Sequence, residues 1–128
     1  MSRYFFRTIA LCVAITIGFV GTHAQAATGT FIGASNHVTE GMVTVTKNAD
    51  GTATVTLHSD FWFDGAPDPR VGFGSNGKYK KGTDISLLQS NAGEQTYTVP
   101  AGINVDDFNE IYIWCKRFAV PLGVAMLN

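Results

Sequence analysis

The chain has 128 residues, of which 9 are lysine or arginine and 10 are aspartate or glutamate, so its formal net charge is −1. A chain without a basic excess is a poor ligand for nucleic acids and anionic membranes, and neither is expected as a partner. The length fits one small domain with a single modest hydrophobic core.

The first residues have the three regions of a cleavable secretory signal. Arg3 and Arg7 supply the positive start, an apolar run follows over 8–20, and the triplet Ala-Gln-Ala at 24–26 supplies a cleavage site. The competing interpretation is a membrane anchor, but the apolar run reaches only about 14 residues, whereas a spanning helix needs about 20. We therefore expect a helical signal peptide over residues 1–26.

A cut after Ala26 leaves a single domain over 27–128. We expect this domain to lie outside the cytoplasm and to have no stable membrane span. The Ala-Gln-Ala ending is typical of a bacterial signal, so we expect an exported protein, periplasmic or secreted. The cut also removes Cys12, which leaves Cys115 as the only cysteine of the domain. One cysteine cannot form an intramolecular disulfide, so the stability of the domain must come from packing.

Alternation of apolar and polar residues is the main structural signal in the domain. Val43 and Val45 alternate with threonines, the same pattern returns over 53–58, and the turn sequence Asn-Ala-Asp-Gly stands between them at 48–51. This pattern predicts a β-hairpin. A proline-containing stretch over 60–70 then predicts a loop.

The second half of the domain predicts shorter elements. A short strand is expected at 71–73, and three glycines with three lysines predict a mobile, solvated loop over 74–82. Residues 95–99 alternate as a strand does. Asn104 can cap a single helical turn, and the most strongly patterned strand follows over 110–116.

The last stretch, 118–127, is apolar except for a turn-like Pro-Leu-Gly segment, and we expect it to form the final buried strand. Together these elements amount to about seven or eight short strands in about 100 residues. The fold class expected is all-β, an antiparallel β-sandwich or small barrel, preceded by the helical signal peptide.

Several short motifs, taken in order, resemble the DM-thirteen (DM13) domain family, the module of Skeletor-type proteins. They are Gly29-x-Phe31, His37 and Gly41, Asp60-Phe61 with Gly65-x-Pro67-Asp68, Gly93-x-Gln95-x-Tyr97-x-x-Pro100, and Ile113-Trp114-Cys115-x-x-Phe118. The match extends over nearly the whole domain. The resemblance implies an extracytoplasmic β domain that takes part in electron transfer, and it places the cysteine of the family at Cys115.

Cys115 is therefore the candidate redox residue. Period two places Ile111, Ile113 and Cys115 on one face of their strand, and Tyr112 and Trp114 on the other. A redox role leaves two chemistries open. Exchange of two electrons needs the thiol of a partner, because the domain has one cysteine. Single-electron transfer instead needs a thiolate ligand to haem or another metal.

The candidate second ligands for such a haem or metal are His37, His58, Met42 and Met126. Arg117 shares the strand parity of the cysteine, and its charge could favour the thiolate. The plain alternatives are exposed histidines and a solvated arginine at a strand end. Covalently attached haem is not expected, because the chain has no Cys-x-x-Cys-His sequence.

Two functions remain open at this point. One is an electron-transfer domain centred on Cys115 that exchanges electrons with an envelope or extracellular redox protein. The other is a non-redox binding or structural module of the cell envelope whose cysteine is buried and inert. Enzyme activity is not expected, because the chain lacks the nucleophile-elbow, zinc-protease, phosphate-loop and dinucleotide motifs.

Overall fold

The computed structural model describes residues 14–19, 21 and 24–128. The expected helical signal peptide falls largely outside this part, and its described residues 14–19 form neither helix nor strand. In the part described, no helix has the length and apolar character needed to cross a membrane. The expected cleavage point lies inside strand β1 (Gln25–Gly33), so a cut after Ala26 would leave that strand to begin at Ala27.

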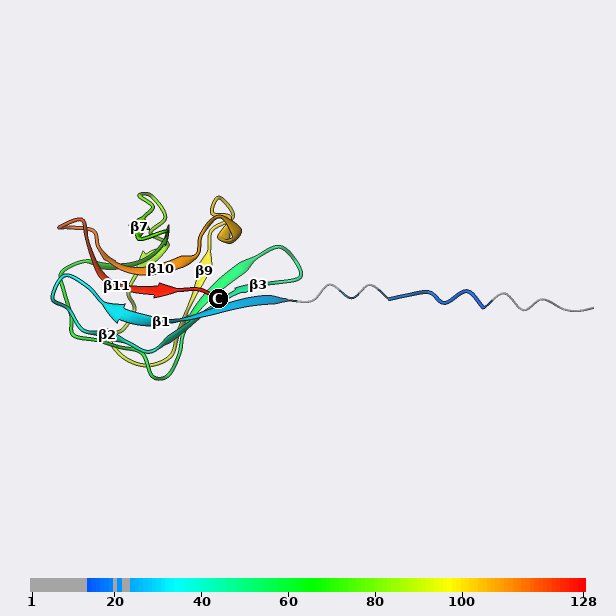
Figure 1. Cartoon of the computed structure of the whole chain (residues 1–128), viewed down its shortest axis with the longest axis horizontal. Helices are drawn as coiled ribbons and strands as arrows, with labels where there is room; N and C mark the ends of the chain where they lie inside the picture. Colours follow the sequence, from blue (N-terminus) through cyan, green and yellow to red (C-terminus); the bar gives the residue numbers. More distant parts are fainter. Residues whose placement is uncertain (1–13, 20, 22–23) are drawn as a thin grey trace, which may run out of the picture.

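The described residues from β1 onward form the expected all-β, antiparallel fold, built as a curled half-barrel (Figure 1). Eight strands follow one another in the order β7-β6-β10-β11-β1-β3-β4-β9, β8 pairs separately with β6, and β2 pairs with β5. The strands are β1 (Gln25–Gly33), β2 (Thr39–Glu40), β3 (Met42–Lys47), β4 (Ala53–Leu57), β5 (Trp62–Phe63), β6 (Pro69–Ser75), β7 (Lys78–Tyr79), β8 (Ser86–Leu87), β9 (Gln95–Val99), β10 (Glu110–Cys115) and β11 (Val120–Met126).

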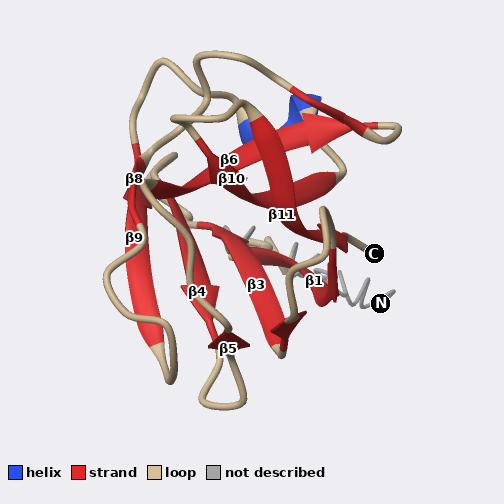
Figure 2. Ribbon diagram, turned by 90° about the vertical axis from the view of Figure 1, so that its left-hand side faces the viewer, coloured by secondary structure: helices blue, strands red, loops and turns tan. Residues whose placement is uncertain are grey.

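In Figure 2, β8, which pairs with β6, lies close to β9, the last strand of the order. Just after β8, the backbone N–H of Gln89 donates to the hydroxyl of Tyr97 at 2.9 Å, and its side chain donates to the carbonyl of Thr96 at 3.3 Å. These bonds join the segment after β8 to β9 without a continuous strand ladder, so the barrel is only half closed.

The predicted hairpin is confirmed as β3 and β4. Val43 pairs with Leu57 and Val45 pairs with Val55, so all four apolar side chains lie on the same face. At the turn, Gly51 has a φ of +88°, a backbone conformation that glycine adopts without strain. The inward alternation and the Asp-Gly turn therefore specify the same register.

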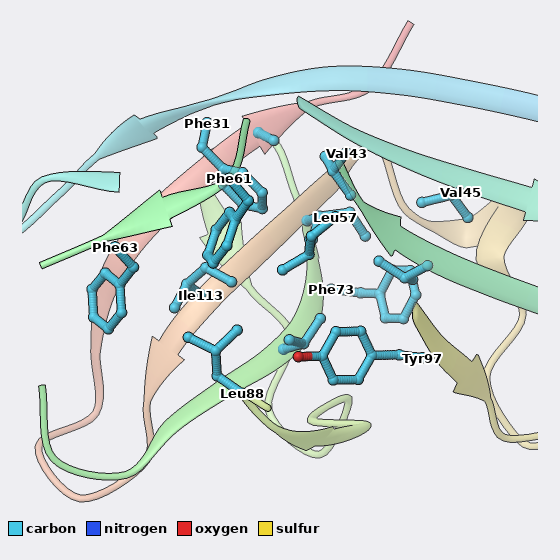
Figure 3. Close-up of a cluster of buried hydrophobic side chains, with 14 of the residues drawn as sticks. Phe31, Val43, Val45, Leu57, Phe61, Phe63, Phe73, Leu88, Tyr97 and Ile113 are labelled. Carbon is cyan, nitrogen blue, oxygen red and sulfur yellow. The ribbon is translucent and has the colours of Figure 1, made fainter. Parts of the chain in front are cut away.

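The hydrophobic core fills the inside of the curl (Figure 3). Every strand of the main sheet that is longer than two residues contributes to it. Its buried members include Phe31, Val43, Val45, Val55, Leu57, Phe61, Phe63, Val71, Phe73, Leu88, Tyr97, Val99, Ile111, Ile113, Cys115, Leu122 and Ala125. With no disulfide at Cys115, this apolar burial is the main favourable term in folding.

The predicted helical turn is confirmed as a short 3₁₀ helix, Val105–Asp107, in which the side chain of Asn104 accepts a hydrogen bond from the backbone N–H of Asp106. Three other expectations differ from the structure. The stretch 60–70, expected to be a loop, contains β5, which pairs with β2, and the first two residues of β6. The stretch 74–82 contains β7, which pairs with β6, so it is an ordered hairpin rather than only a loop. The Pro-Leu-Gly segment lies inside β11, where a register irregularity accommodates it.

The strand β1 was not expected, and it lies at the centre of the sheet. Its first six residues pair with β3 and its last three residues pair with β11. Gly29 permits this placement, because a Cβ there would stand 2.3 Å from the backbone oxygen of Met126. The final strand, β11, is therefore held between β10 and β1 rather than at an edge of the sheet.

Candidate functional site

Cys115 is the last residue of β10, and its side chain points into the core. It pairs with Val120 of β11 and with Pro69 of β6. Only 1% of the residue is exposed, and it shares the inner face with Ile111 and Ile113, both fully buried. The prediction that Ile111, Ile113 and Cys115 share one face of the strand is therefore confirmed.

One segment of chain, residues 64–68, supplies the only hydrogen-bond partner of the sulfur among the described residues. Sγ of Cys115 contacts the carbonyl oxygen of Pro67 at 3.2 Å in hydrogen-bonding geometry, and the backbone N–H of Lys116 donates to the carbonyl of Asp68 at 3.2 Å. Asp68 has a φ of +51° and forms an ion pair with Arg70 at 2.7 Å. We call residues 64–68 the cover segment, because its Pro67 carbonyl lies against the sulfur.

His37 lies at the edge of the same region without reaching the thiol. Its Nδ1 is 2.8 Å from a carboxylate oxygen of Asp64, whose second oxygen accepts a hydrogen bond from the backbone N–H of Val38. That backbone bond, followed by the bond from His37, holds the pKa of Asp64 below its usual value. The histidine therefore ties the turn before β2 to the start of the cover segment.

The other candidate ligands are spread over the molecule. Nε2 of His58 is 2.6 Å from the hydroxyl of Thr44, which occupies that ring nitrogen. Met42 is 39% exposed and Met126 is 68% exposed. Met126 pairs with Glu110, at the opposite end of β10 from Cys115, and five strand residues span about 17 Å.

Arg117 follows the end of β10 and is exposed in a turn. The strand stops at Cys115, so strand parity does not extend to the arginine. Among the described residues, no three His, Cys, Asp or Glu side chains are grouped so that they could hold a metal ion.

The surroundings of the sulfur do not fit a haem or a metal ion. A thiolate ligand needs an open position beside the sulfur, but here the Pro67 carbonyl and core side chains occupy the surroundings of Sγ. None of the proposed second ligands makes a hydrogen bond or ion pair with Cys115 in the described structure. No step of a mechanism is therefore derived through such a group.

On the outer face of β10 lies a cluster of three aromatic rings that the sequence reasoning did not identify. Tyr79 stacks on Trp114 with ring centroids 4.0 Å apart and an interplanar angle of 8°. Tyr112 meets both edge-on, at 5.6 Å from Tyr79 and 6.4 Å from Trp114. We call these three residues the aromatic cluster.

Two glycines of β6 make room for the rings of the cluster. A Cβ at Gly72 would stand 2.7 Å from the Tyr79 ring, and a Cβ at Gly74 would stand 2.4 Å from the Tyr112 ring. In the sheet, Tyr112 pairs with Gly72. The rings therefore lie directly on the backbone of β6, which explains how Tyr112 is only 2% exposed on the outer face of the sheet.

Tyr112 also has a charged partner. Its hydroxyl donates to Oε2 of Glu110 at 2.9 Å, and Oε1 of Glu110 accepts from the backbone N–H of Gly77 at 2.7 Å. Glu110 is only 4% exposed. Burial, followed by the hydrogen bond and negative charge of Glu110, raises the pKa of Tyr112 to about 12.

Tyr79 has a different environment. Burial raises the pKa of its hydroxyl, and the neighbouring Thr83 hydroxyl opposes that rise. However, Oη of Tyr79 makes no hydrogen bond of acceptable geometry in the described structure, because the Thr83 hydroxyl is engaged with the backbone of Phe73 and Lys80. Of the two tyrosines in the cluster, Tyr112 alone has a carboxylate acceptor for its proton.

The cluster opens to solvent at a pocket beside Trp114. The pocket has a volume of about 680 Å³ and a mainly apolar lining. Lys116 forms an ion pair with Asp84 at 3.0 Å on its wall. Its lining residues are Tyr79, Lys81, Gly82, Asp84, Trp114, Lys116 and Ala119.

One sequence signal for this cluster was available. Tyr112 and Trp114 were predicted to lie on the face of their strand opposite Cys115. Gly72 and Gly74 likewise stand two residues apart on the neighbouring strand, and so share a face. Their pairing depends on the register of β6 against β10, which separates the partners by about 40 residues of chain. Sequence periodicity within one strand does not contain that information.

A comparison with family models identifies the group to which the chain belongs. The model of the family described as electron transfer DM13 matches residues 30–127, which begin in β1 and end just after β11. No match was found among curated proteins or among solved structures. The chain belongs to the electron transfer DM13 family.

Proposed function

We propose that this protein transfers electrons outside the cytoplasm, and that Cys115 is the group on which the exchange depends. Membership of the electron transfer family supports the activity. The signal-like first 26 residues support export, to the periplasm or as a secreted protein. The partner is a redox protein of the envelope or the extracellular space.

The position of Cys115 carries the proposal. The sulfur lies at the end of a strand and against the cover segment. That segment is held at one end by the bonds of Asp64 to His37 and Val38, and at the other by the contacts of Pro67 and Asp68. Local opening of such a segment requires far less than global unfolding. Cys115 becomes available when the cover segment lifts away from the sulfur.

The exchange itself needs a sulfur from the partner. In the opened state the Cys115 thiol loses its proton to solvent, and the thiolate attacks a disulfide of the partner. The bond between Cys115 and one partner sulfur forms while the partner disulfide breaks, and the second partner sulfur leaves as a thiolate. The Cys115 sulfur is thereby oxidised from a thiolate to the disulfide level, the leaving sulfur is reduced to a thiolate, and the attacked sulfur keeps its oxidation state.

A second function is favoured by the 1% exposure of the same residue. Cysteine is among the most frequently buried residue types, and a sealed thiol behaves as a small apolar side chain. On that interpretation the protein is a non-redox binding or structural module of the envelope. The two functions differ in whether native Cys115 reacts.

Redox buffers of reduced and oxidised glutathione separate the two functions. Electron transfer through Cys115 predicts that the folded protein forms a mixed disulfide with glutathione, detected by mass, and that a reductant reverses it. Cys115→Ser is the matched control, because a serine hydroxyl can still donate to the Pro67 carbonyl and keep the cover segment in place. Absence of the mixed disulfide in the folded wild type, with its appearance only after denaturation, would support the non-redox module.

A further inference from the structure

The aromatic cluster on the outer face of β10 is built differently from a packing cluster. Two of its rings are stacked at the edge of a surface pocket, and the third ends in a buried hydrogen bond to a carboxylate. Burial of an ionised carboxylate is costly unless it is hydrogen-bonded. Glu110 has two such bonds, one from Tyr112 and one from the backbone of Gly77.

We propose that Tyr112 is a proton-coupled one-electron redox site, and that Tyr79 and Trp114 connect it to the surface pocket. This inference deepens the proposed electron transfer and rests on it, but it does not depend on Cys115. Its partner is a one-electron oxidant of high potential, of the class of high-valent metal centres, that docks beside Trp114.

The chemical step is balanced within the pair of Tyr112 and Glu110. The phenol of Tyr112 loses one electron to the oxidant and, at the same time, passes its proton along the 2.9 Å hydrogen bond to Oε2 of Glu110. The products are a neutral phenoxyl radical and a neutral carboxylic acid, and the oxidant is reduced by one electron. Reduction of the radical returns the proton to the phenol.

The carboxylate is what makes this step favourable at Tyr112. Oxidation of the phenol makes it a strong acid, and without proton transfer the site, in which Tyr112 is 2% exposed, would hold both a cation radical and a carboxylate away from water, which is costly. Glu110 removes both charges by accepting the proton. In the resting state the proton stays on Tyr112, because burial, followed by the hydrogen bond and charge of Glu110, raises the pKa of the phenol.

The connection to the surface runs through rings in direct contact. Trp114 borders the pocket and stacks on Tyr79 at 4.0 Å, and both rings meet Tyr112 edge-on. The Tyr79 hydroxyl has no acceptor for its proton in the described structure, so a radical on Tyr79 is not trapped there. An oxidising equivalent that enters at Trp114 therefore passes on to Tyr112.

Photochemical oxidation tests the proposal on the purified full-length protein. A ruthenium tris-bipyridine complex, oxidised to the trivalent state by light and a quencher, serves as the high-potential oxidant. Rapidly frozen samples are then examined by electron paramagnetic resonance. The wild type is expected to give a tyrosyl radical, and Tyr112→Phe is expected to reduce that signal at least tenfold.

Tyr97→Phe is the matched control. Tyr97 is also buried, at 3% exposure, but its hydroxyl bonds to the amide oxygen of Gln95, which does not serve as a base. This variant is expected to keep the radical signal. Glu110→Gln removes the proton acceptor while keeping the shape of the side chain, and is expected to slow formation of the radical at least tenfold.

Equal signals in the wild type and Tyr112→Phe would overturn the inference, as would an unchanged rate in Glu110→Gln. If either variant does not fold, high-field spectra decide, because a hydrogen bond to the phenoxyl oxygen shifts the g-tensor. In Tyr97→Phe, which removes the other hydrogen-bonded phenol of the described structure, Tyr112 predicts a hydrogen-bonded radical, whereas a radical without a hydrogen bond points to Tyr79 and contradicts the proposal. The same measurement on Cys115→Ser separates the two proposals, because the radical at Tyr112 is expected to persist without the thiol.

Discussion

Two residues on opposite faces of β10 show how neighbours in sequence acquire different chemistry. Cys115 is sealed in the core under a proline carbonyl, without a side-chain base against the sulfur. Tyr112, three residues earlier, lies on the outer face with a carboxylate at hydrogen-bond distance. The proposed exchange at the sulfur therefore requires it to come into contact with a partner, whereas the proposed oxidation of the phenol requires no such movement.

The raised pKa of Tyr112 predicts a loss of stability in alkaline solution. The pKa is about 12 in the folded protein, whereas an unfolded tyrosine has a pKa near 10. The stabilising contribution is complete below about pH 10 and is lost as the pH rises toward about 12, because the unfolded chain releases the proton first. Urea unfolding between these pH values measures the effect.

Tyr112→Phe is the comparison for that titration. Because burial also raises the pKa of Tyr97 and Tyr79, some alkaline loss of stability should remain in the variant. The variant is expected to lose less stability than the wild type over the same range. Parallel curves for the two proteins would show that Tyr112 is not tightly coupled to Glu110.

At the scale of elements, the pairing of β6 with β10 positions both sites. Its inner face carries Cys115 beside Pro69, and its outer face carries the aromatic rings over the two glycines. The hairpin of β6 and β7 then brings Tyr79 onto Trp114. A change in the backbone spacing of this pair therefore disturbs the aromatic cluster more than any single ring substitution.

Gly74→Ala tests this dependence. The new Cβ would stand 2.4 Å both from the carbonyl oxygen of Lys78 and from the Tyr112 ring. Overpacking of this kind costs about 1–3 kcal/mol, and a backbone oxygen cannot move aside as a flexible side chain can. We expect a loss of free energy of unfolding in or above that range, measured by urea denaturation.

Gly102→Ala is the matched control for the same experiment. A Cβ at Gly102 meets nothing within 4 Å, and its φ lies outside the positive range. The control is expected to change the free energy of unfolding by no more than about 0.5 kcal/mol. If Gly74→Ala behaves like the control, the close approach of the rings to β6 is wrong.

Much of the element pattern could be predicted from sequence because local signals agreed. The hairpin of β3 and β4 combines alternation with an Asp-Gly turn, and Asn104 caps its helical turn as expected. The strand β1 has no such agreement, since its threonines, alanines and glycines give weak alternation. Its place is decided by the β3 and β11 edges that it joins, which are distant in sequence.

The candidate site divides in the same way. Periodicity gave the inner face of Cys115, but it could not show that His37 binds Asp64, that His58 binds Thr44, or that Met126 lies at the far end of the strand. Each of those positions depends on contacts between distant segments. Tyr112 and Glu110 stand two residues apart on β10, so the sequence shows that they share a face. The burial of both side chains, however, depends on contacts with Gly77 and Tyr79 of the neighbouring hairpin.

At the scale of the whole molecule, the fold places a continuous apolar core on one side of β10 and a small polar and aromatic site on the other. The core accounts for stability without a disulfide in the described domain. Leu57 lies in its centre, fully buried, whereas Leu87 on β8 is 49% exposed. Substitution of each leucine therefore compares the contribution of a core side chain to the free energy of unfolding with that of a half-exposed one.

Leu57→Ala is expected to lower the free energy of unfolding by about 2–5 kcal/mol, because it removes buried methyl groups and leaves a cavity. Leu87→Ala is expected to change it by less than about 1 kcal/mol, because that side chain remains half exposed. Urea unfolding of both variants checks the difference. Similar losses at the two positions would contradict the described core.

The central claim is that native Cys115 can be reached by local opening of the cover segment. The most direct test is the rate at which a thiol reagent modifies the folded protein as urea is increased below the unfolding transition. Local opening predicts a rate that is nearly independent of urea, and that rises severalfold in Asp68→Gly, which removes the ion pair to Arg70 yet tolerates the φ of +51°. A rate that follows global unfolding at every urea concentration, and that Asp68→Gly changes only through stability, would contradict it.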